Sequence, residues 1–366
     1  MKNIILRNDL NKFVYTNIVK KICFEFDAEK THNFFIKFGK ILGSSALIKK
    51  ITSAAFNYQN ELLEQDILGI KFTNPVGLSA GFDKNAELLG ILGDVGFGFA
   101  EVGSVTARSC KGNSGVRLKR IPEKRSIFVN FGLNNKGANK IHSKLKSKKY
   151  EISFGVSIAK TNCKETADPE IAVKDYVYSI KKFKDVGQYI TINISCPNAY
   201  GGQPFSNPEL YNKLLKEVSK LKISKPLFVK LSPDLDKNTI DKIIKISNRH
   251  KIISGFICSN LTKKGLAKSG GFSGKIVADK ANELLAYAYK KTKGKYILMG
   301  VGGIFSAEDA YKKIKLGANL VQLITGMIYE GPNLISEINR GLVNLLKKDG
   351  YSNIGEAVGA DFKNKK

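Results

Sequence analysis

The sequence predicts an α/β protein that folds as a (β/α)8 barrel with a small N-terminal helical extension. From about Leu68 onward, short apolar runs rich in Val, Ile, Gly and Phe alternate with longer Lys-rich amphipathic stretches, which is the rhythm of repeating strand and helix units. The runs number roughly eight, which is the count that closes a parallel barrel. The early Gly-x-Gly-x-x-Gly turn typical of an open, doubly wound sheet is not found.

Strands and helices are expected to alternate along the chain. Strands are expected at Val76–Ala80, Phe99–Val105, Phe154–Ile158, Ile190–Ile194, Leu227–Leu231, Gly255–Cys258, Tyr296–Val301 and Leu320–Ile324. Helices are expected at Ile171–Phe183, Glu209–Leu221, Thr239–Asn248, Ile276–Lys291 and Ala307–Lys315. A length of 366 residues with 43% hydrophobic content suits one barrel domain, assigned to residues 51–350, with additions at both ends.

The additions are an N-terminal helical segment and a basic C-terminal tail. Residues 1–50 place apolar and aromatic residues near 3.6-residue spacing with lysines between them, so two short amphipathic helices are expected. These helices either cap the barrel or lie on a membrane surface. Residues 351–366 form a basic tail that we expect to fray from Gly355 onward.

The longest segment outside the repeating pattern is the insertion Ala107–Asn135, after the second expected strand. It carries the basic residues Arg108, Lys111, Arg117, Lys119, Arg120, Lys124 and Arg125. The insertion is either a solvated loop or, because it lies on the face where barrel active sites sit, a lid or an anion-attracting rim.

The composition limits the classes of partner and the compartment. Sixty Lys and Arg against 32 Asp and Glu give a formal charge of +28. Lysines recur on nearly every expected helix, so solvated helix faces can account for this charge. A nucleic acid, an anionic membrane surface or a small anionic substrate as partner would also account for it. The five cysteines have unrelated spacings, so neither disulfides nor a metal site is predicted and a reducing cytoplasm is expected. No apolar run approaches the roughly 20 residues of a membrane-spanning helix, which predicts a soluble or surface-bound protein.

Polar side chains cluster at the expected C-terminal ends of the strands. In chain order they are Ala80–Lys84, Gly103–Thr106, Ser157, Asn193, Cys196, Asn198, Lys230, Ser232, Ser259 and Asn260. These strand ends meet at one pocket in a barrel, so two lysines would lie there among carboxamides and hydroxyls. Such a pocket suits a planar, anionic ligand rich in amide groups.

Three residues of this cluster carry side chains with strong chemical preferences. Lys230 lies inside an apolar strand, where a buried ammonium is costly unless it meets a ligand or a structural ion partner. Lys84 opens a helix-like segment and fits the pocket or the surface equally well. Cys196 stands between Asn193 and Asn198, and is either a small buried hydrophobe or a thiol that acts as a general base or nucleophile.

Two glycine-rich segments lie near the seventh and eighth expected strands, at Gly270–Gly274 and Gly300–Gly303. Backbone amides at such turns can form a phosphate cradle in this half of a barrel, although ordinary tight turns have the same composition. Together the two segments favour a phosphorylated ligand such as a mononucleotide cofactor.

Several passages, in this order and at barrel spacing, resemble the dihydroorotate dehydrogenases, flavin-dependent barrel enzymes of pyrimidine synthesis. The resemblance covers about residues 10–348. The passages are Asn74–Lys84, Glu101–Thr106, Asn193–Asn198, Val229–Lys230, Ser259–Asn260, Gly271–Gly274, Gly300–Gly303, Leu320–Leu323 and Gly331–Pro332.

The resemblance implies a cofactor, a substrate and roles for individual residues. FMN would be held by Ala80, Gly81, Ser104, Ser157, Asn193, Lys230, Ser259, Gly274, Gly303 and Thr325. Dihydroorotate or orotate would be contacted by Lys84, Asn130, Phe131, Gly132, Leu133, Asn193, Asn198 and Asn260. Cys196 would be the catalytic base that removes the C5 proton while C6 passes hydride to flavin N5, and Lys230 would stabilise the negative charge of the reduced flavin.

The N-terminal helices, Arg117–Arg120 and Gly132–Asn135 are similar to the quinone-linked, membrane-associated class 2 branch. In that branch the N-terminal helices form a quinone tunnel, which His32 and Arg120 would line here. The implied location is the cytoplasmic side of the cell membrane, bound peripherally, with a soluble cytoplasmic protein as second choice. Class 2 enzymes normally use a serine base, whereas Cys196 is typical of soluble class 1, so quinone is the expected acceptor and fumarate the alternative.

A second departure from the family pattern concerns the substrate. Val129 stands where the family usually has Asn, so either Asn130 takes over the contact or the enzyme accepts another dihydropyrimidine. Losing a hydrogen bond to a buried ligand group costs about 1 to 3 kcal/mol.

Two other function classes remain as alternatives. A transfer-RNA dihydrouridine synthase would suit the positive charge, but its basic residues should form a C-terminal RNA-binding domain, and only Lys347–Lys366 remain after the last helix. No nucleic-acid partner is therefore expected. The other alternative is a barrel that serves as a scaffold without enzymatic activity. In that case the clustering of lysines and asparagines at the strand ends would be accidental.

Overall fold

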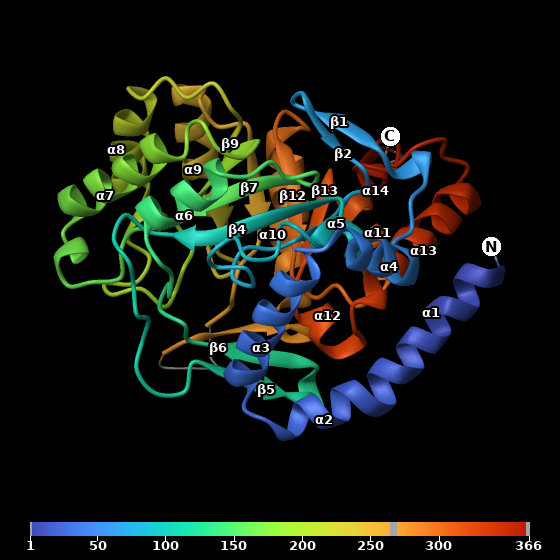
Figure 1. The fold of residues 1–366 in the computed structure, drawn as a ribbon. Coiled ribbons are helices and arrows are strands. Elements are labelled where there is room, and N and C mark those ends of the chain that lie inside the picture. The colour runs from blue at the N-terminus through green and yellow to red at the C-terminus, as the bar shows by residue number, and fades with distance from the viewer. Residues whose placement is uncertain (1, 264–268, 364–366) are drawn as a thin grey trace.

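The computed structural model describes residues 2–263 and 269–363 and has a closed barrel of eight parallel strands at its centre (Figure 1). Each barrel strand pairs with the next one along the chain, and the last closes on the first. The barrel strands are β3 Val76–Leu78, β4 Phe99–Val105, β7 Ser153–Ile158, β8 Tyr189–Asn193, β9 Leu227–Leu231, β10 Gly255–Cys258, β12 Ile297–Val301 and β13 Leu320–Leu323. The (β/α)8 prediction is confirmed, and each expected strand agrees to within a residue or two at its ends.

Helices surround the barrel and bury one face against it, as expected for strands that must be covered on both sides. They are α5 Leu92–Val95, α6 Ala138–Lys146, α7 Pro169–Lys182, α8 Pro208–Ser219, α9 Lys237–His250, α10 Ala278–Thr292, α11 Ala307–Lys315, α12 Thr325–Glu330 and α13 Asn333–Asp349. Short 3-10 turns lie at Glu61–Leu63, Pro122–Lys124, Glu165–Ala167, Pro204–Ser206 and Lys275–Val277. The five helices expected from periodicity are all present.

The N-terminal extension contains more helix than the two short helices expected. Its helices are α1 Lys2–Val14, α2 Lys20–Glu25, α3 Ala28–Leu42 and α4 Ala46–Phe56, with a π-helical turn at Tyr15–Val19 joining the first two. Asp27 and Ser45 cap α3 and α4 by accepting hydrogen bonds from backbone N–H groups. Because Ser45 starts a new helix, α4 crosses the expected boundary at residue 50. Arg7 ties α1 to the end of α4 through the carbonyls of Ala54 and Asn57, at 2.9 and 3.0 Å.

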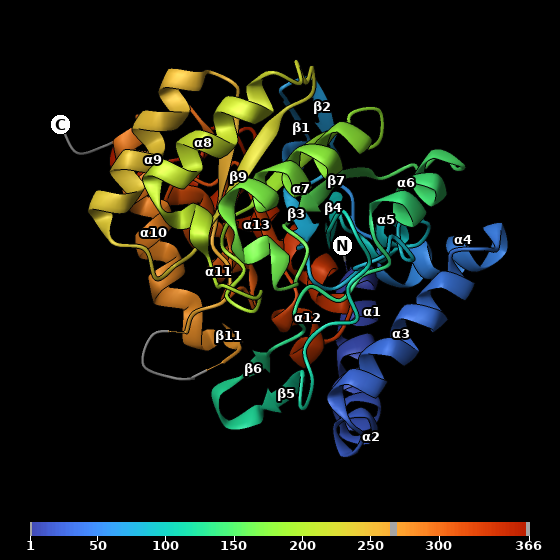
Figure 2. The ribbon, with the colours of Figure 1, turned by 90° about the vertical axis from the view of Figure 1, so that its left-hand side faces the viewer.

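The insertion after β4 is a β-hairpin rather than a solvated loop. Strands β5 Leu118–Ile121 and β6 Ser126–Val129 pair antiparallel, and β11 Gly271–Gly274 adds a third strand (Figure 2). Two arginines expected to form an anion-attracting rim are paired instead, Arg117 with Glu29 of α3 and Arg125 with Glu330 of α12. The hairpin is therefore fastened to the helical extension over the C-terminal end of the barrel.

The opposite end of the barrel is closed by a second hairpin, β1 Gln65–Ile67 and β2 Ile70–Phe72. The Phe72 ring meets Phe99 edge-on with 5.3 Å between centroids. This closure leaves the C-terminal end as the open end of the barrel.

The C-terminal tail does not fray from Gly355 as predicted. Ile354 and Ala357 are fully buried, and the Ile354 amide donates to the Leu62 carbonyl at 2.8 Å. The segment ends in α14 Ala360–Lys363, because Ile354 and Ala357 pack into the core against distant parts of the chain, which the local composition does not reveal. Residues 364–366 lie outside the described residues.

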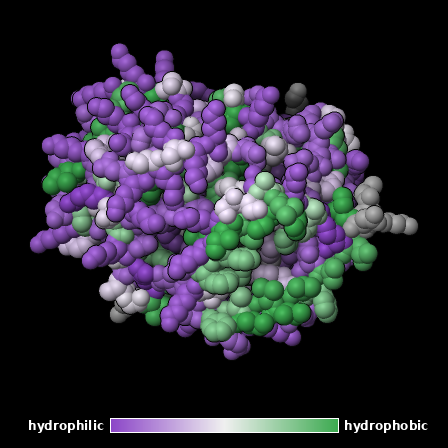
Figure 3. Space-filling model, in the orientation of Figure 1, coloured by the Kyte–Doolittle hydropathy of each residue, from purple (hydrophilic) through white to green (hydrophobic). Residues whose placement is uncertain are grey.

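A broad apolar surface covers the N-terminal helices (Figure 3). Its exposed side chains are Ile5, Leu6, Leu10, Phe13, Val14, Ile18, Ile22, Phe26, Phe34, Phe38, Ile41, Leu47 and Ile51. Throughout residues 2–263 and 269–363, no helix combines the length and apolar character that crossing a bilayer requires.

Candidate active site at the C-terminal end of the barrel

A cavity of about 140 Å³ lies between the C-terminal strand ends and the β5–β6 hairpin, and most of the predicted site residues line it. The predicted residues on its wall are His32, Ala80, Gly81, Lys84, Ser104, Phe131, Gly132, Leu133, Asn193, Cys196, Asn198, Lys230 and Asn260. They come from strands far apart in sequence because parallel strands present their carboxyl ends at one face.

A chain of hydrogen bonds connects three of the predicted cofactor residues. Asn193 donates to the Ser104 hydroxyl at 2.8 Å, and that hydroxyl lies 2.8 Å from the hydroxyl of Ser157. Asn193 also receives two bonds from Ser195, at 3.1 and 3.0 Å, which fix the orientation of its amide. Ser157 is buried and reaches the site through Ser104 rather than by lining the cavity.

Lys230 is the buried cation of the site, with 3% of its surface exposed. Its ammonium makes one hydrogen bond within the described part of the chain, to the Ser79 hydroxyl at 3.2 Å. Burial lowers the pKa of Lys230, and the charge of Glu101 in the barrel centre partly offsets this. Two ammonium protons remain available, so the side chain can meet an electron-rich ligand, as its place in an apolar strand predicted.

Cys196 lies on the cavity wall and also borders a cavity of about 10 Å³ that Lys160 lines. Burial raises the pKa of the Cys196 thiol, and the Asn198 backbone N–H and the charges of Lys160 and Lys230 partly offset this. Lys160 is itself 3% exposed and donates to the Tyr200 carbonyl at 2.6 Å. The charges of these two buried lysines thus favour the thiolate form of the thiol.

Lys84 points into the site rather than to the surface. Its ammonium lies 3.7 Å from the centre of the Phe131 ring and 3.3 Å from His32 Nε2, which must accept because an ammonium only donates. Burial lowers the pKa of Lys84 to about 8, while Glu29 and Asp83 act in the opposite direction. Burial and the charge of Lys84 lower the pKa of His32 to about 3, so His32 is neutral near pH 7.

One buried polar atom on the wall of this cavity, Asn198 Oδ1, has no hydrogen-bond partner among the described residues. The amide nitrogen of Asn198 donates to the Val129 carbonyl at 3.0 Å. Val129 lines the cavity, whereas Asn130 does not, since its side chain accepts from Asn113 at 2.8 Å. The structure therefore does not bring the predicted Asn130 to the cavity wall.

Asn113 is a residue that the sequence reasoning missed. Its amide nitrogen donates to Asn130 Oδ1 at 2.8 Å and to the Asn198 carbonyl at 3.0 Å, and its oxygen accepts from Asn162 at 3.0 Å. The side chain thereby joins the insertion to the loop that carries Asn198. No local pattern marks it, because its partners come from other parts of the chain.

Replacing Asn113 by alanine should weaken substrate binding, because the loop that carries Asn198 loses its fixed position. We expect the KM for the substrate to rise roughly tenfold, with a smaller change in kcat and no change in cofactor content, since losing such a half-buried hydrogen bond costs about 1 to 3 kcal/mol. Steady-state kinetics of Asn113→Ala measures this effect. The control is Asn248→Ala in α9, a half-buried asparagine far from the site that accepts hydrogen bonds from Lys295 and Tyr296. An unchanged KM in Asn113→Ala would show that the loop holds Asn198 without it.

A second cavity of about 60 Å³ adjoins the first beside the two predicted glycine loops. Gly303, Thr325, Ser273, Lys230 and Asn260 are among the residues on its wall. A methyl group on Gly303, whose φ is +75°, would lie 2.4 Å from the Ala278 side chain, so only glycine fits there. Ser273 and Thr325 place their hydroxyls 2.9 Å apart, and together with glycine amides they suit a phosphate.

Two predicted cofactor residues stand next to this wall rather than on it. Gly274 follows Ser273 in β11, and a side chain on it would lie 2.6 Å from the Arg125 carbonyl. Ser259 follows β10 and donates to the Val301 carbonyl at 3.3 Å. Both residues support the backbone that forms the cavity.

An apolar cavity of about 300 Å³ lies between the N-terminal helices and the barrel, and His32 and Arg120 both line it as predicted. Arg120 donates to the Phe26 carbonyl at 2.7 Å, and its guanidinium lies 4.7 Å from the centre of the Phe24 ring. The apolar cavity shares five wall residues with the first cavity, namely His32, Phe82, Leu118, Ile127 and Ile328. The two cavities are therefore adjacent, with these five side chains between them.

The fold and the site together define a (β/α)8-barrel protein with two adjoining polar cavities at the C-terminal ends of its strands. A family model described as dihydroorotate dehydrogenase matches residues 62–346, which is more than half of the chain. The chain belongs to the dihydroorotate dehydrogenase family. This assignment disfavours a dihydrouridine synthase and implies a flavin cofactor.

Individual relatives match nearly the whole chain. A protein of Sulfurovum sp. named dihydroorotate dehydrogenase (quinone) is 39% identical over 360 residues, covering 96% of this chain and 99% of the relative. A protein of the same name from Sulfurimonas denitrificans is 38% identical and covers 94% and 98%. The crystal structure of the Eimeria tenella enzyme in complex with ferulenol superposes with a TM-score of 0.82 at 26% identity, covering 92% of this chain and 96% of that one.

Proposed function

We propose that this protein oxidises dihydroorotate to orotate with FMN as cofactor, Cys196 as base and a quinone as electron acceptor. Family membership supports the substrate, and the name of the relatives that match nearly the whole chain supports the acceptor. The single observation that carries the proposal for the site is the meeting of Lys84, Asn198, Cys196 and Lys230 around one cavity.

The donors around the two polar cavities fit FMN. Ser273, Thr325 and the amides near Gly303 would hold the phosphate, and Ser104, Asn193 and Lys230 would meet the polar edge of the ring system. Bound FMN supplies an acceptor for two electrons. The Lys230 ammonium, buried and with protons to spare, stabilises negative charge at the site where it develops.

The substrate is held and activated by the opposite wall. Lys84 would pair with the carboxylate of dihydroorotate, since its ammonium is fixed between Phe131 and His32. The unpartnered Asn198 oxygen would accept from a ring N–H, and Asn260 would complete the contacts. The Cys196 thiolate would take the C5 proton, with Lys160 and Lys230 stabilising its charge.

The quinone would enter through the apolar cavity beside the N-terminal helices. His32 is neutral and stands on the walls of both cavities, next to the site. Arg120 would donate to a quinone carbonyl, because its guanidinium is already held in place by the Phe26 carbonyl. The exposed apolar side chains over α1 to α4 (Figure 3) would lie on an anionic membrane, at the cytoplasmic side and bound peripherally.

One spectroscopic experiment tests the donor and the acceptor. The purified protein should be yellow, should release FMN on heating, and should bleach when dihydroorotate is added without oxygen. The bleached protein should regain colour with a soluble quinone and not with fumarate or NAD⁺. Reoxidation by fumarate alone would refute the quinone assignment.

The donor arm of the same experiment checks the effect of Val129. Because Val129 replaces an asparagine at the pyrimidine, dihydroorotate should be compared with dihydrouracil and dihydrothymine. Bleaching by one of these and not by dihydroorotate would show an altered substrate, and a colourless protein would favour a scaffold.

A further inference from the structure

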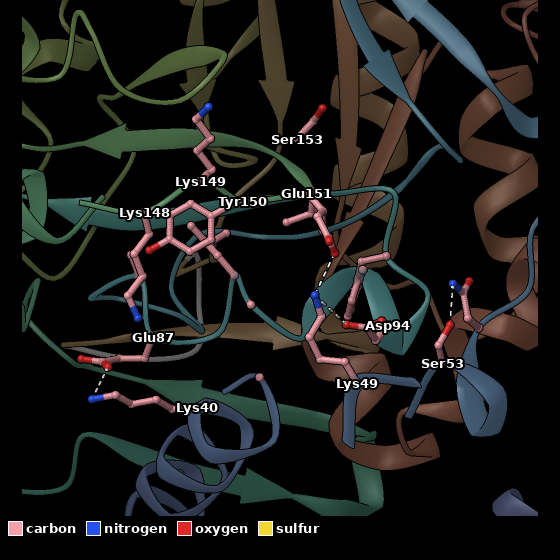
Figure 4. Close-up of a pocket in the computed structure, with 18 of the residues that line it drawn as sticks. Lys40, Lys49, Ser53, Glu87, Asp94, Lys148, Lys149, Tyr150, Glu151 and Ser153 are labelled. Atoms are coloured by element: carbon pink, nitrogen blue, oxygen red, sulfur yellow. Dashed lines mark hydrogen bonds and ion pairs between the residues drawn. The ribbon is translucent and has the colours of Figure 1, made fainter. Parts of the chain in front are cut away.

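A cavity much larger than either polar cavity of the active site lies elsewhere in the molecule. It has a volume of about 1040 Å³ and lies between the corner of α3 and α4 and the N-terminal ends of β3, β4 and β7 (Figure 4). The function proposed above uses the other end of the barrel and leaves this cavity unexplained.

The carboxylates of this cavity are already neutralised by neighbouring lysines. Glu87 pairs with Lys40 at 3.2 Å and with Lys144 at 2.6 Å. Lys49 stands between Glu151, at 2.8 Å, and Asp94, at 3.9 Å (Figure 4). These pairs form a fixed charged framework on the wall.

Four further lysines on the same wall have no acidic partner among the described residues. They are Lys37, Lys71, Lys148 and Lys149, and they come from α3, from β2 and from the segment after α6. In Figure 4, Lys149 extends away from the three carboxylates. All four residues are exposed and line the same cavity, so the wall of the cavity carries more positive than negative side chains.

The remaining wall suits a ligand that is larger than a single ion. Ser44, Ser53 and Asn57 offer hydroxyl and amide groups, and Tyr150 offers an aromatic ring. Several lysines from separate segments are groups that bind phosphates, and the Ser53 hydroxyl, which accepts from Asn57 at 3.4 Å, still has its own proton to donate. The adjoining α3–α4 corner carries the exposed side chains of Ile41, Leu47 and Ile51.

We propose that this cavity binds a phosphate-bearing polyanion, either a free phosphate compound or the headgroup of an anionic lipid. The unpaired lysines hold the phosphates and the ion-paired framework keeps the cavity open. Both ligands would present phosphate groups to the lysines. The apolar corner beside the cavity would contact acyl chains only if the ligand is a lipid headgroup.

The test removes unpaired lysines and leaves the ion pairs intact. Lys71→Gln, Lys148→Gln and Lys149→Gln are combined in the full, flavin-loaded protein, and binding of pyrophosphate and tripolyphosphate is measured by calorimetry. In parallel, cosedimentation of the protein with anionic phosphatidylglycerol vesicles is compared with its cosedimentation with neutral phosphatidylcholine vesicles. We expect the triple variant to lose more than about tenfold in affinity for one of these anionic probes, with unchanged flavin content.

The matched control removes three exposed lysines from α8 and α9, which follow β8 and β9 on another side of the barrel. These are Lys216→Gln, Lys242→Gln and Lys245→Gln, and this variant should bind like the unchanged protein. If the Lys71, Lys148 and Lys149 variant loses affinity for pyrophosphate or tripolyphosphate, the ligand is a free phosphate compound. If it loses affinity for the anionic vesicles alone, the ligand is a lipid headgroup. Equal losses in both variants, or no binding of any probe by the unchanged protein, would overturn the proposal.

Discussion

Replacing Cys196 by alanine is expected to lower the rate of flavin reduction by dihydroorotate by about 10² to 10⁴-fold, the range that a positioned general base contributes. The thiol lies on the wall of the site, and the charges of the buried Lys160 and Lys230 favour its thiolate form. Stopped-flow absorbance of the flavin without oxygen measures the rate directly. Flavin content should not change.

Two further observations distinguish a base from a packing residue. Cys196→Ser should keep measurable activity, and Cys163→Ala, which removes a thiol outside the site, should keep full activity. Because burial raises the pKa of Cys196, the reduction rate should rise with pH through the alkaline range, as the fraction of thiolate increases. Full activity in Cys196→Ala would contradict the assignment.

Replacing Lys230 by methionine should lower the reduction rate by about 10² to 10³-fold, the loss that follows removal of one preorganised charge donor. Methionine is chosen because its unbranched side chain fills a volume close to that of lysine without carrying the charge. The variant should also hold its flavin less tightly, since the ammonium is a predicted contact. Reduction kinetics and the flavin-to-protein ratio measure the two effects.

Lys313 offers a matched control for this substitution. It is also buried, at 2% exposure, and its ammonium donates to Asn282 at 2.7 Å outside the site. Lys313→Met should therefore keep its flavin and its reduction rate. Equal losses in both variants would mean that Lys230 acts through stability alone.

The barrel could be predicted because its strands are short, apolar and separated by amphipathic helices. The strand Leu227–Leu231 was identified at its observed bounds, since a run buried on all sides has no polar interruption except Lys230. The polar residues at strand ends could be grouped for the same reason, because parallel topology alone brings Ser104, Asn193 and Lys230 to one face.

The parts that were predicted wrongly depend on contacts between distant segments. The hairpin of β5 and β6 is stabilised by pairing with β11, more than 140 residues away, as in the pair Gly271 and Val129. The ordered tail depends on a bond from Ile354 to Leu62. Periodicity within a window of sequence carries no information about such partners.

The sequence by itself determined the barrel, the set of polar groups at its mouth and the family, because these follow from local hydrophobic rhythm and from short motifs. Only the tertiary structure decided how the side chains meet: that Lys84 turns inward to Phe131 and His32, that Asn130 is held by Asn113 away from the cavity, and that unpaired lysines gather at the far end. The physical reason is that the charge and orientation of a side chain depend on burial and on partners, and both are set when distant segments pack together.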